Sequence, residues 1–287
     1  MTKMHAVLAL TFAVLIQPAL GTEAKGSVAV ETREHQTPRG INVADKNGVT
    51  PLMRACARGS VSEVKRLIAS GANVNAADKS GGTPLLHALA HVPSHPIVKL
   101  LLDAGADPSK RSSEGFSPLC IEISEDNGDM KSIEMLIDNE ADQAKAATYA
   151  LYCLQGFHSN IYGPSKAEFL LKRGADANDR IPSGNIPFIV DFAAYGDSRV
   201  LSVLIQKGHA DVNATSSTGE TALMAAARTK HAGSVKVLLD MGADCNRRNH
   251  DGLRALDLAR VKEPNQKWNE EHRIETVNLL SGCSTSK

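Results

Sequence analysis

Apolar residues along this chain are spaced as on one face of a short helix, and the spacing recurs. Val64, Leu67 and Ile68, for example, follow the i, i+3, i+4 rule of an amphipathic helix. Six such stripes end in two aliphatic residues, at Leu67-Ile68, Leu101-Leu102, Leu136-Ile137, Leu170-Leu171, Leu204-Ile205 and Leu238-Leu239. The pattern predicts a series of short helices packed through aliphatic side chains.

Turn residues separate these stripes at a fixed period. Glycines follow the stripes at Gly71, Gly105, Gly174, Gly208 and Gly242, spaced by 34, 69, 34 and 34 residues, and Glu140-Ala141-Asp142 falls within the double gap. Helix starts stand upstream, as Thr50-Pro51-Leu52, Thr83-Pro84-Leu85, Ser117-Pro118-Leu119 and Thr221-Ala222-Leu223. Thr or Ser is a good N-cap, Pro suits the first helical position, and Gly favours a left-handed C-cap. Each period therefore predicts a helix–turn–helix unit, which must stack on its neighbours to bury its apolar face.

The period, the Thr-Pro-Leu starts and the Gly-Ala-Asp endings resemble the ankyrin repeat. The resemblance implies an all-α fold, an ankyrin-repeat α-solenoid of about seven helix–turn–helix units with β-turn fingers. The expected units are 45–77, 78–111, 112–145, 146–180, 181–215, 216–249 and 250–283, followed by a tail at 284–287. The resemblance places a His after Thr-Pro-Leu, and we align only His87 with it. Other units have a different residue there, such as Met53 or Met224. This departure argues against a regular hydrogen-bond ladder between repeats.

The N-terminal residues carry a targeting signal. Residues 1–21 combine Lys3, an apolar run at Ala6–Ile16 and small residues before position 22, which is the layout of a secretory signal peptide. Residues 22–44 are expected to be a polar lead-in and N-terminal cap, in which Ile41-Asn42-Val43 is the tail of a truncated first repeat. The chain is therefore expected to be exported, into the periplasm of a Gram-negative bacterium and otherwise as a secreted protein, and not to associate with membranes once the signal is removed.

Composition excludes several classes of protein. Lys and Arg number 32 and so do Asp and Glu, which argues against a nucleic-acid binder, and 42% hydrophobic residues argue against a disordered chain. Phosphate-binding glycine loops, nucleophile elbows and His-Glu-x-x-His motifs do not occur. His87 and His91 stand one helical turn apart, but no acid lies close in sequence to complete a zinc site, so we interpret His87 as structural. We expect no enzyme activity, no cofactor and no metal.

The five cysteines are too widely spaced for a Cys-x-x-Cys motif. Cys245 and Cys283 end the last two units at nearly equivalent places, so a disulfide between them is expected to fix the C-terminal repeat. Cys120 and Cys153, in neighbouring first helices, are a second and weaker candidate pair. Cys56 is expected to be a small core residue.

Charge and aromatic residues concentrate in the centre of the chain. Residues 112–145 carry nine acids against Lys131 and Lys145, a net charge of −7, and the next unit holds three of the four tyrosines. Aromatic residues are enriched at binding hot spots and complementary charge speeds association. The predicted partner-binding residues are Glu122, Glu125, Asp126, Tyr149, Tyr152, Phe157 and Tyr162, facing a basic region of the partner. The alternative is that the tyrosines pack an irregular repeat and the acids form a solvated face.

These observations favour a non-enzymatic scaffold that is a monomer when unbound and binds one specific protein partner through its central repeats. One specific form of this function is a periplasmic immunity protein that neutralises a toxin or lipase effector. Others are a stress-protective accessory to a periplasmic enzyme such as a catalase, or a secreted effector that binds host proteins. A cryptic hydrolase is the alternative from a different class.

Overall fold

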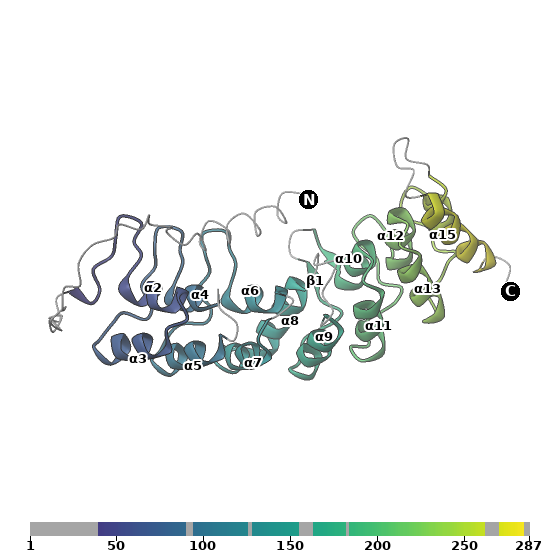
Figure 1. The fold of residues 1–287 in the computed structure, drawn as a ribbon. Coiled ribbons are helices and arrows are strands. Elements are labelled where there is room, and N and C mark those ends of the chain that lie inside the picture. Colours follow the sequence, from purple (N-terminus) through teal and green to yellow (C-terminus); the bar gives the residue numbers. More distant parts are fainter. Residues whose placement is uncertain are drawn as a thin grey trace. The chain divides into compact units, whose positions relative to one another are not determined.

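The computed structural model describes residues 40–89, 94–125, 128–154, 163–181, 184–261 and 270–283. The predicted signal peptide and residues 22–39 of the lead-in lie outside this range. The chain divides into two compact units, the first formed by Met1–Glu122 and Asn127–Glu140 and the second by Ile123–Asp126 and Ala141–Lys287. Both are built from pairs of short helices, in agreement with the expected ankyrin-repeat fold (Figure 1).

The first unit stacks three helix pairs. They are α2 (Pro51–Ala57) with α3 (Val61–Ala69), α4 (Pro84–Ala88) with α5 (His95–Asp103), and α6 (Pro118–Ser124) with α7 (Met130–Asp138). The last two residues of α6 belong to the second unit. Helix α2 packs on α4, and α3, α5 and α7 pack in succession, so first and second helices form two separate rows (Figure 1).

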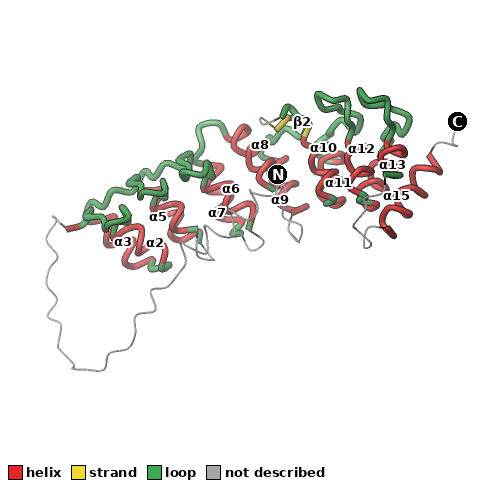
Figure 2. Tube along the Cα trace, turned by 90° about the horizontal axis from the view of Figure 1, so that it is seen from above, coloured by secondary structure: helices red, strands yellow, loops and turns green. Residues whose placement is uncertain are grey.

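The second unit contains four helix pairs. They are α8 (Gln143–Cys153) with α9 (Gly163–Lys172), α10 (Phe188–Tyr195) with α11 (Ser198–Gln206), α12 (Ala222–Thr229) with α13 (Ala232–Asp240), and α14 (Ala255–Ala259) with α15 (Glu270–Cys283). An antiparallel hairpin of β1 (Arg180–Ile181) and β2 (Ile186–Pro187) precedes α10. Within each unit the turns gather along one side of the helices (Figure 2).

Side-chain caps begin the first helices as the sequence predicts. The hydroxyl oxygens of Thr50, Thr83 and Thr221 accept hydrogen bonds from the backbone N–H groups three residues on, each at 3.3 Å. For Thr83 the donor is Leu86. His87 therefore lies one residue beyond the position that Met53 and Met224 hold, which corrects our alignment of these residues. The His87 ring instead contacts the Asp78 carboxylate of its own repeat at 2.9 Å.

Four of the second helices end at a glycine whose backbone is in the left-handed conformation. Gly71, Gly105, Gly174 and Gly242 have φ angles of +85°, +85°, +88° and +87°. Glycine adopts this conformation without a steric penalty from Cβ, which explains why it recurs at this place. In the fifth repeat His209, with φ of +53°, is the left-handed residue in place of Gly208.

The core is filled by small and aliphatic side chains. In α12, Ala222, Ala225, Ala226 and Ala227 are all buried. Elsewhere the first and the second helices both bury larger Leu, Ile and Val side chains. Close packing of these residues explains how a chain with 4% aromatic residues fills the core of each unit.

A ladder of asparagine side chains connects successive repeats. The side-chain oxygens of Asn42, Asn75, Asn178 and Asn213 accept hydrogen bonds of 2.8, 2.8, 2.8 and 2.9 Å from the backbone N–H groups of Asn73, Asp107, Asp211 and Asp244. Thr148 does the same for Asp176 at 2.9 Å. The expectation that these repeats lack a regular ladder is therefore wrong, because asparagine at the end of one unit supplies it. The bond from Asn42 also supports the prediction of a truncated first repeat.

A disulfide joins the last two repeats. Cys245 and Cys283 are bonded, with their Cα atoms 6.5 Å apart, and the bond ties the turn after α13 to the end of α15. Cys120 and Cys153 are also disulfide-bonded cysteines, and their pairing with each other stays a prediction. Cys56 is free and completely buried, and burial raises the pKa of its thiol to about 12.

No helix of the described residues combines the length and the apolarity needed to cross a membrane.

The asparagine ladder predicts a selective loss of stability. Asn75 accepts from Asp107 and also donates to the Gly105 carbonyl at 2.8 Å, so Asn75→Ala removes two hydrogen bonds between repeats. We expect the free energy of unfolding to fall by about 1–2 kcal/mol in urea denaturation followed by circular dichroism. Asn246→Ala is the matched control, since Asn246 is exposed at the equivalent place after α13. Equal losses in both variants would contradict a role for the ladder.

Thiol counting tests the oxidation state of the cysteines. We expect no reaction with a thiol reagent in the native protein, one reactive thiol after denaturation without reductant, and five after reduction. The single thiol is Cys56, which is protected in the folded state by its burial and raised pKa. Five reactive thiols in the denatured, unreduced protein would exclude both disulfides.

Candidate partner-binding surface

Glu122, one of the predicted contact residues, lies in the interior. Its side chain is 3% exposed, and its carboxylate accepts hydrogen bonds from the Ser94 hydroxyl at 2.9 Å and from the Asp129 backbone N–H at 2.8 Å. Ser94 also contacts the hydroxyl of the buried Ser132 at 2.8 Å. The prediction that Glu122 contacts a partner is therefore corrected: its charge organises the start of α5 and of α7.

The neighbouring His95 and Asp129 belong to the same polar cluster. The ring Nδ1 of His95 lies 2.5 Å from the Asp129 carboxylate, which also caps α7 by accepting from the Lys131 backbone N–H at 3.0 Å. Burial raises the pKa of Asp129, but the hydrogen bonds from His95 and Lys131 outweigh it and hold this pKa below its usual range. The Ser94 hydroxyl is directed to Glu122 and Ser132, so this cluster joins helices and does not pair Ser94 with His95 as nucleophile and base.

The remaining acids of residues 112–145 lie at several different places. Asp142 caps α8 by accepting from the Lys145 backbone N–H at 3.0 Å, while Glu134 and Asp138 are exposed on α7. Glu125 is exposed, and its backbone carbonyl accepts a hydrogen bond from Lys166. Asp126 lies outside the described residues. The net charge of this segment is therefore distributed between caps, a buried cluster and separate exposed positions.

The two described tyrosines of the prediction form part of an aromatic cluster. Tyr149 and Tyr152 lie three residues apart on α8, with ring centroids separated by 6.1 Å. The Tyr152 ring also stacks on Phe188 of α10 at 6.4 Å, with an angle of 25° between the ring planes. Both tyrosines are half-buried. Phe157 and Tyr162 lie outside the described residues, so their part in the cluster stays a prediction.

Helix α10 adds two residues that the sequence reasoning did not select. Asp191 lies three residues after Phe188 and four before Tyr195, so all three share one side of the helix. Burial raises the pKa of Asp191 to about 6. The pKa values of Tyr152 and Tyr195 are raised by burial first and then by the negative charge of Asp191. A detectable signal was present: Asp191 is the one charged residue in the apolar run Phe188–Tyr195.

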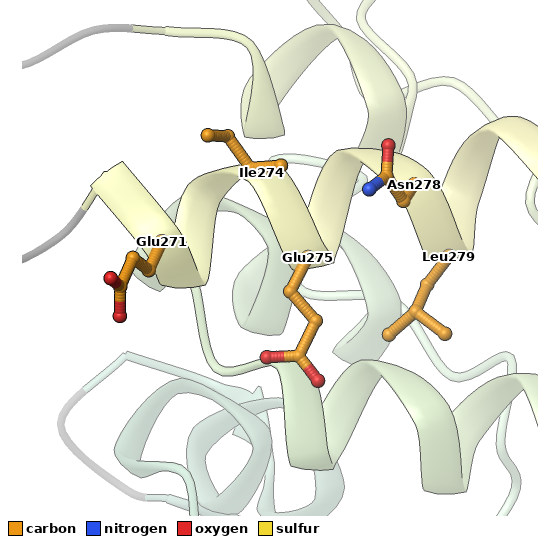
Figure 3. A pocket seen from close by; sticks show the side chains of 5 residues that line it. All are labelled: Glu271, Ile274, Glu275, Asn278 and Leu279. Atoms are coloured by element: carbon orange, nitrogen blue, oxygen red, sulfur yellow. The ribbon is translucent and has the colours of Figure 1, made fainter.

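Two shallow hollows lie away from this cluster. One is lined by Glu271, Ile274, Glu275, Asn278 and Leu279, all on α15. Ile274 and Asn278 point to one side of the helix and Glu275 and Leu279 to the other, so this hollow follows the outer surface of a single helix (Figure 3). The other, beside α2 and α3, includes Arg54 and Arg66, whose charges are already paired with Asp45 and Glu63 at 3.2 and 2.8 Å.

Histidines do not assemble a metal site in the part of the chain that the structure describes. His87 contacts Asp78 and His95 contacts Asp129, and groups of three potential ligands do not occur there. His91 lies outside the described residues. Within the described ranges, the acids and histidines that are buried together act in local hydrogen bonding.

Stacked helix pairs, capped by left-handed residues and joined through their turns, define a helical-repeat protein. Residues 29–112 and 157–249 match the family model for ankyrin repeats, described as three copies, and together they cover more than half of the chain. The chain therefore belongs to the ankyrin-repeat family, whose repeats are a general scaffold for protein–protein interaction.

Two individual proteins are similar in sequence to part of this chain. Alpha-latrocrustotoxin-Lt1a of Latrodectus tredecimguttatus is 30% identical over 173 residues, which is 56% of this chain and 12% of the toxin. Alpha-latroinsectotoxin-Lt1a of the same species is 35% identical over 94 residues, 33% of this chain and 6% of the toxin. The chain thus spans a small part of the length of these relatives.

Solved structures support the fold. The ankyrin repeat domain of Bcl-3, described as a unique member of the IkappaB protein family, has a TM-score of 0.64 at 24% identity over 83% of this chain and 100% of its own. The human ASB11 ankyrin repeat domain has a TM-score of 0.60 at 24% identity over 79% of this chain and 98% of its own.

The position of Asp191 predicts a pH-dependent gain of stability on its neutralisation. Because its folded-state pKa of about 6 lies above the ordinary value of 3.8, the folded protein holds a proton that the unfolded chain releases between these pH values. Stability therefore falls as pH rises through this interval. We expect Asp191→Asn to raise the free energy of unfolding at pH 7.5 by about 1–2 kcal/mol, allowing for partial solvent screening.

Urea denaturation at pH 7.5 and pH 3.5 measures this effect. The gain should almost disappear at pH 3.5, where Asp191 is protonated in the folded protein and largely protonated in the unfolded chain. Asp251→Asn, at an exposed finger position, is the control and should change stability little at either pH. A gain of the same size at both pH values would show that the charge of Asp191 is not its cause.

Proposed function

We propose that this chain is an exported, non-enzymatic protein that binds one protein partner through its central repeats. The observation that carries the proposal is the half-buried cluster of Tyr149, Tyr152 and Asp191, which lies on the first helices of the fourth and fifth repeats. Partly desolvated aromatic side chains beside a charge are typical of binding hot spots. This location shifts the proposed centre from the third and fourth repeats to the fourth and fifth.

The proposed export rests on the signal-like N-terminal sequence and on the cysteines. Disulfides persist in oxidising compartments such as the periplasm or the extracellular space, and the Cys245–Cys283 bond is consistent with that destination. A repeat held by a disulfide also suits a protein that acts outside the cytosol, without cytosolic chaperones. The toxin relatives share only a stretch of repeats, so the likeness supports the scaffold and no toxic activity.

Affinity capture from the exported fraction of the source organism tests this function. The double variant Tyr149→Ser/Tyr152→Ser should weaken capture of the partner at least about tenfold, because truncating hot-spot aromatics costs 2 kcal/mol or more. The control Ile274→Ser/Leu279→Ser alters the exposed hollow on α15 and should leave capture unchanged.

The outcome separates the possible roles. A toxin or lipase as the captured protein supports immunity, a periplasmic enzyme supports an accessory role, and a host protein supports an effector role. Failure to capture any protein at a defined stoichiometry, or loss of capture only in the α15 variant, would contradict binding through the central repeats.

A further inference from the structure

The fourth residue of the first helix differs in charge from one repeat to another. This position is Arg54 in α2, His87 in α4, Ala225 in α12 and Asp191 in α10. In the first two repeats the group pairs with an aspartate five residues before the helix cap. Arg54 lies 3.2 Å from Asp45, and His87 lies 2.9 Å from Asp78. In these two repeats the group at this position is therefore paired within its own repeat.

In the fifth repeat this arrangement is reversed. The residue at the position is the acid Asp191. The Ile181 carbonyl accepts a hydrogen bond from the Gly184 N–H, just as the carbonyls of Asp45 and Asp78 accept from the glycine three residues on, so the uncharged Ile181 stands in the place of the aspartate. Within the described ranges no cation pairs with the Asp191 carboxylate, although its side chain is only partly exposed. A desolvated carboxylate without a counter-charge is costly to the fold, so a cation supplied by a ligand would be favourable here.

The surroundings of Asp191 restrict what that cation can be. Asp191 lies one helical turn before Tyr195 on α10 and three residues after Phe188, and the Tyr152 ring stacks on Phe188, so the carboxylate shares one side of α10 with this aromatic cluster. The Tyr152 ring lies 6.1 Å from the Tyr149 ring and 6.4 Å from the Phe188 ring, centroid to centroid, so it belongs to a packed group of rings. A planar guanidinium group can stack on such rings and direct two N–H groups at one carboxylate, which the compact ammonium of lysine cannot do.

We propose that Tyr152, Asp191 and Tyr195 form an anchor site for an arginine side chain of the partner protein. The proposal rests on the proposed function, since it requires that the occupant is a protein. The arginine would belong to the basic region that the sequence predicts on the partner. It would contact α8 and α10 and not the acidic third repeat. The exposed side of α15 offers no comparable site, because its acids Glu271 and Glu275 are accompanied by aliphatic and amide groups.

A titration of the full chain with N-acetyl-arginine methylamide tests the site. Nuclear magnetic resonance of the ¹³C-labelled tyrosine rings reports binding, and single tyrosine variants assign the signals of the four tyrosines. We expect saturable shifts of the Tyr152 and Tyr195 signals. The citrulline analogue, which has the same shape without the charge, should bind at least about tenfold more weakly.

Two variants complete the experiment. Asp191→Asn should weaken arginine binding at least about tenfold while remaining folded, because it removes a desolvated charge. Asp251→Asn removes an exposed acid elsewhere in the same unit and should leave binding unchanged. Binding that is not saturable, that is equal for citrulline, or that persists in Asp191→Asn would overturn the site.

The result can be separated from the test of the proposed function. Partner capture that depends on Tyr149 and Tyr152, without arginine binding, would overturn the arginine site and leave the protein-binding function standing. Saturable arginine binding that requires Asp191, in a chain that captures no protein, would support the site and contradict the function.

Discussion

The structure depends on one constraint: a pair of helices of this length cannot bury its own apolar face, so every repeat needs a neighbour. Aliphatic packing supplies most of the attraction, and the asparagine ladder fixes how far each repeat may slide on the next. Because Asn75 and its equivalents bind backbone groups of the following repeat, they also fix where the next turn begins. The positions of the inner helices, and of the side chains they present, follow from this register.

Several acids of the described residues cap helices or join neighbouring segments. Glu122 and Asp129 join the starts of α5 and α7, Asp142 caps α8, and Asp78 holds His87. A high local charge is therefore not by itself evidence of a binding surface, since acids with internal partners are unavailable to ligands. Asp191 differs because no cation pairs with it within the described ranges, and Phe188 and Tyr195 share its side of α10. Burial raises its pKa.

The seventh repeat is joined to the sixth by a covalent bond as well as by packing. The α15 helix packs on α13 and α14, and its outer side exposes Ile274 and several polar residues. The Cys245–Cys283 bond reduces the freedom of this repeat in the unfolded chain and so adds to the stabilisation that the packing of α15 provides. A redox-dependent bond at this place is consistent with the proposed exported location.

The sequence by itself determined the repeat fold and the main features of its helix ends. Thr50, Thr83 and Gly71 act through neighbours three or four residues away, so their roles can be inferred from spacing. It also selected Tyr149 and Tyr152, whose concentration in one unit is visible without a structure. Only the tertiary structure decided that Glu122 is buried and that Tyr152 stacks on Phe188, three residues before Asp191 on α10. These relations join residues far apart in the chain, and the burial of a charge depends on how the repeats stack, which no local pattern encodes.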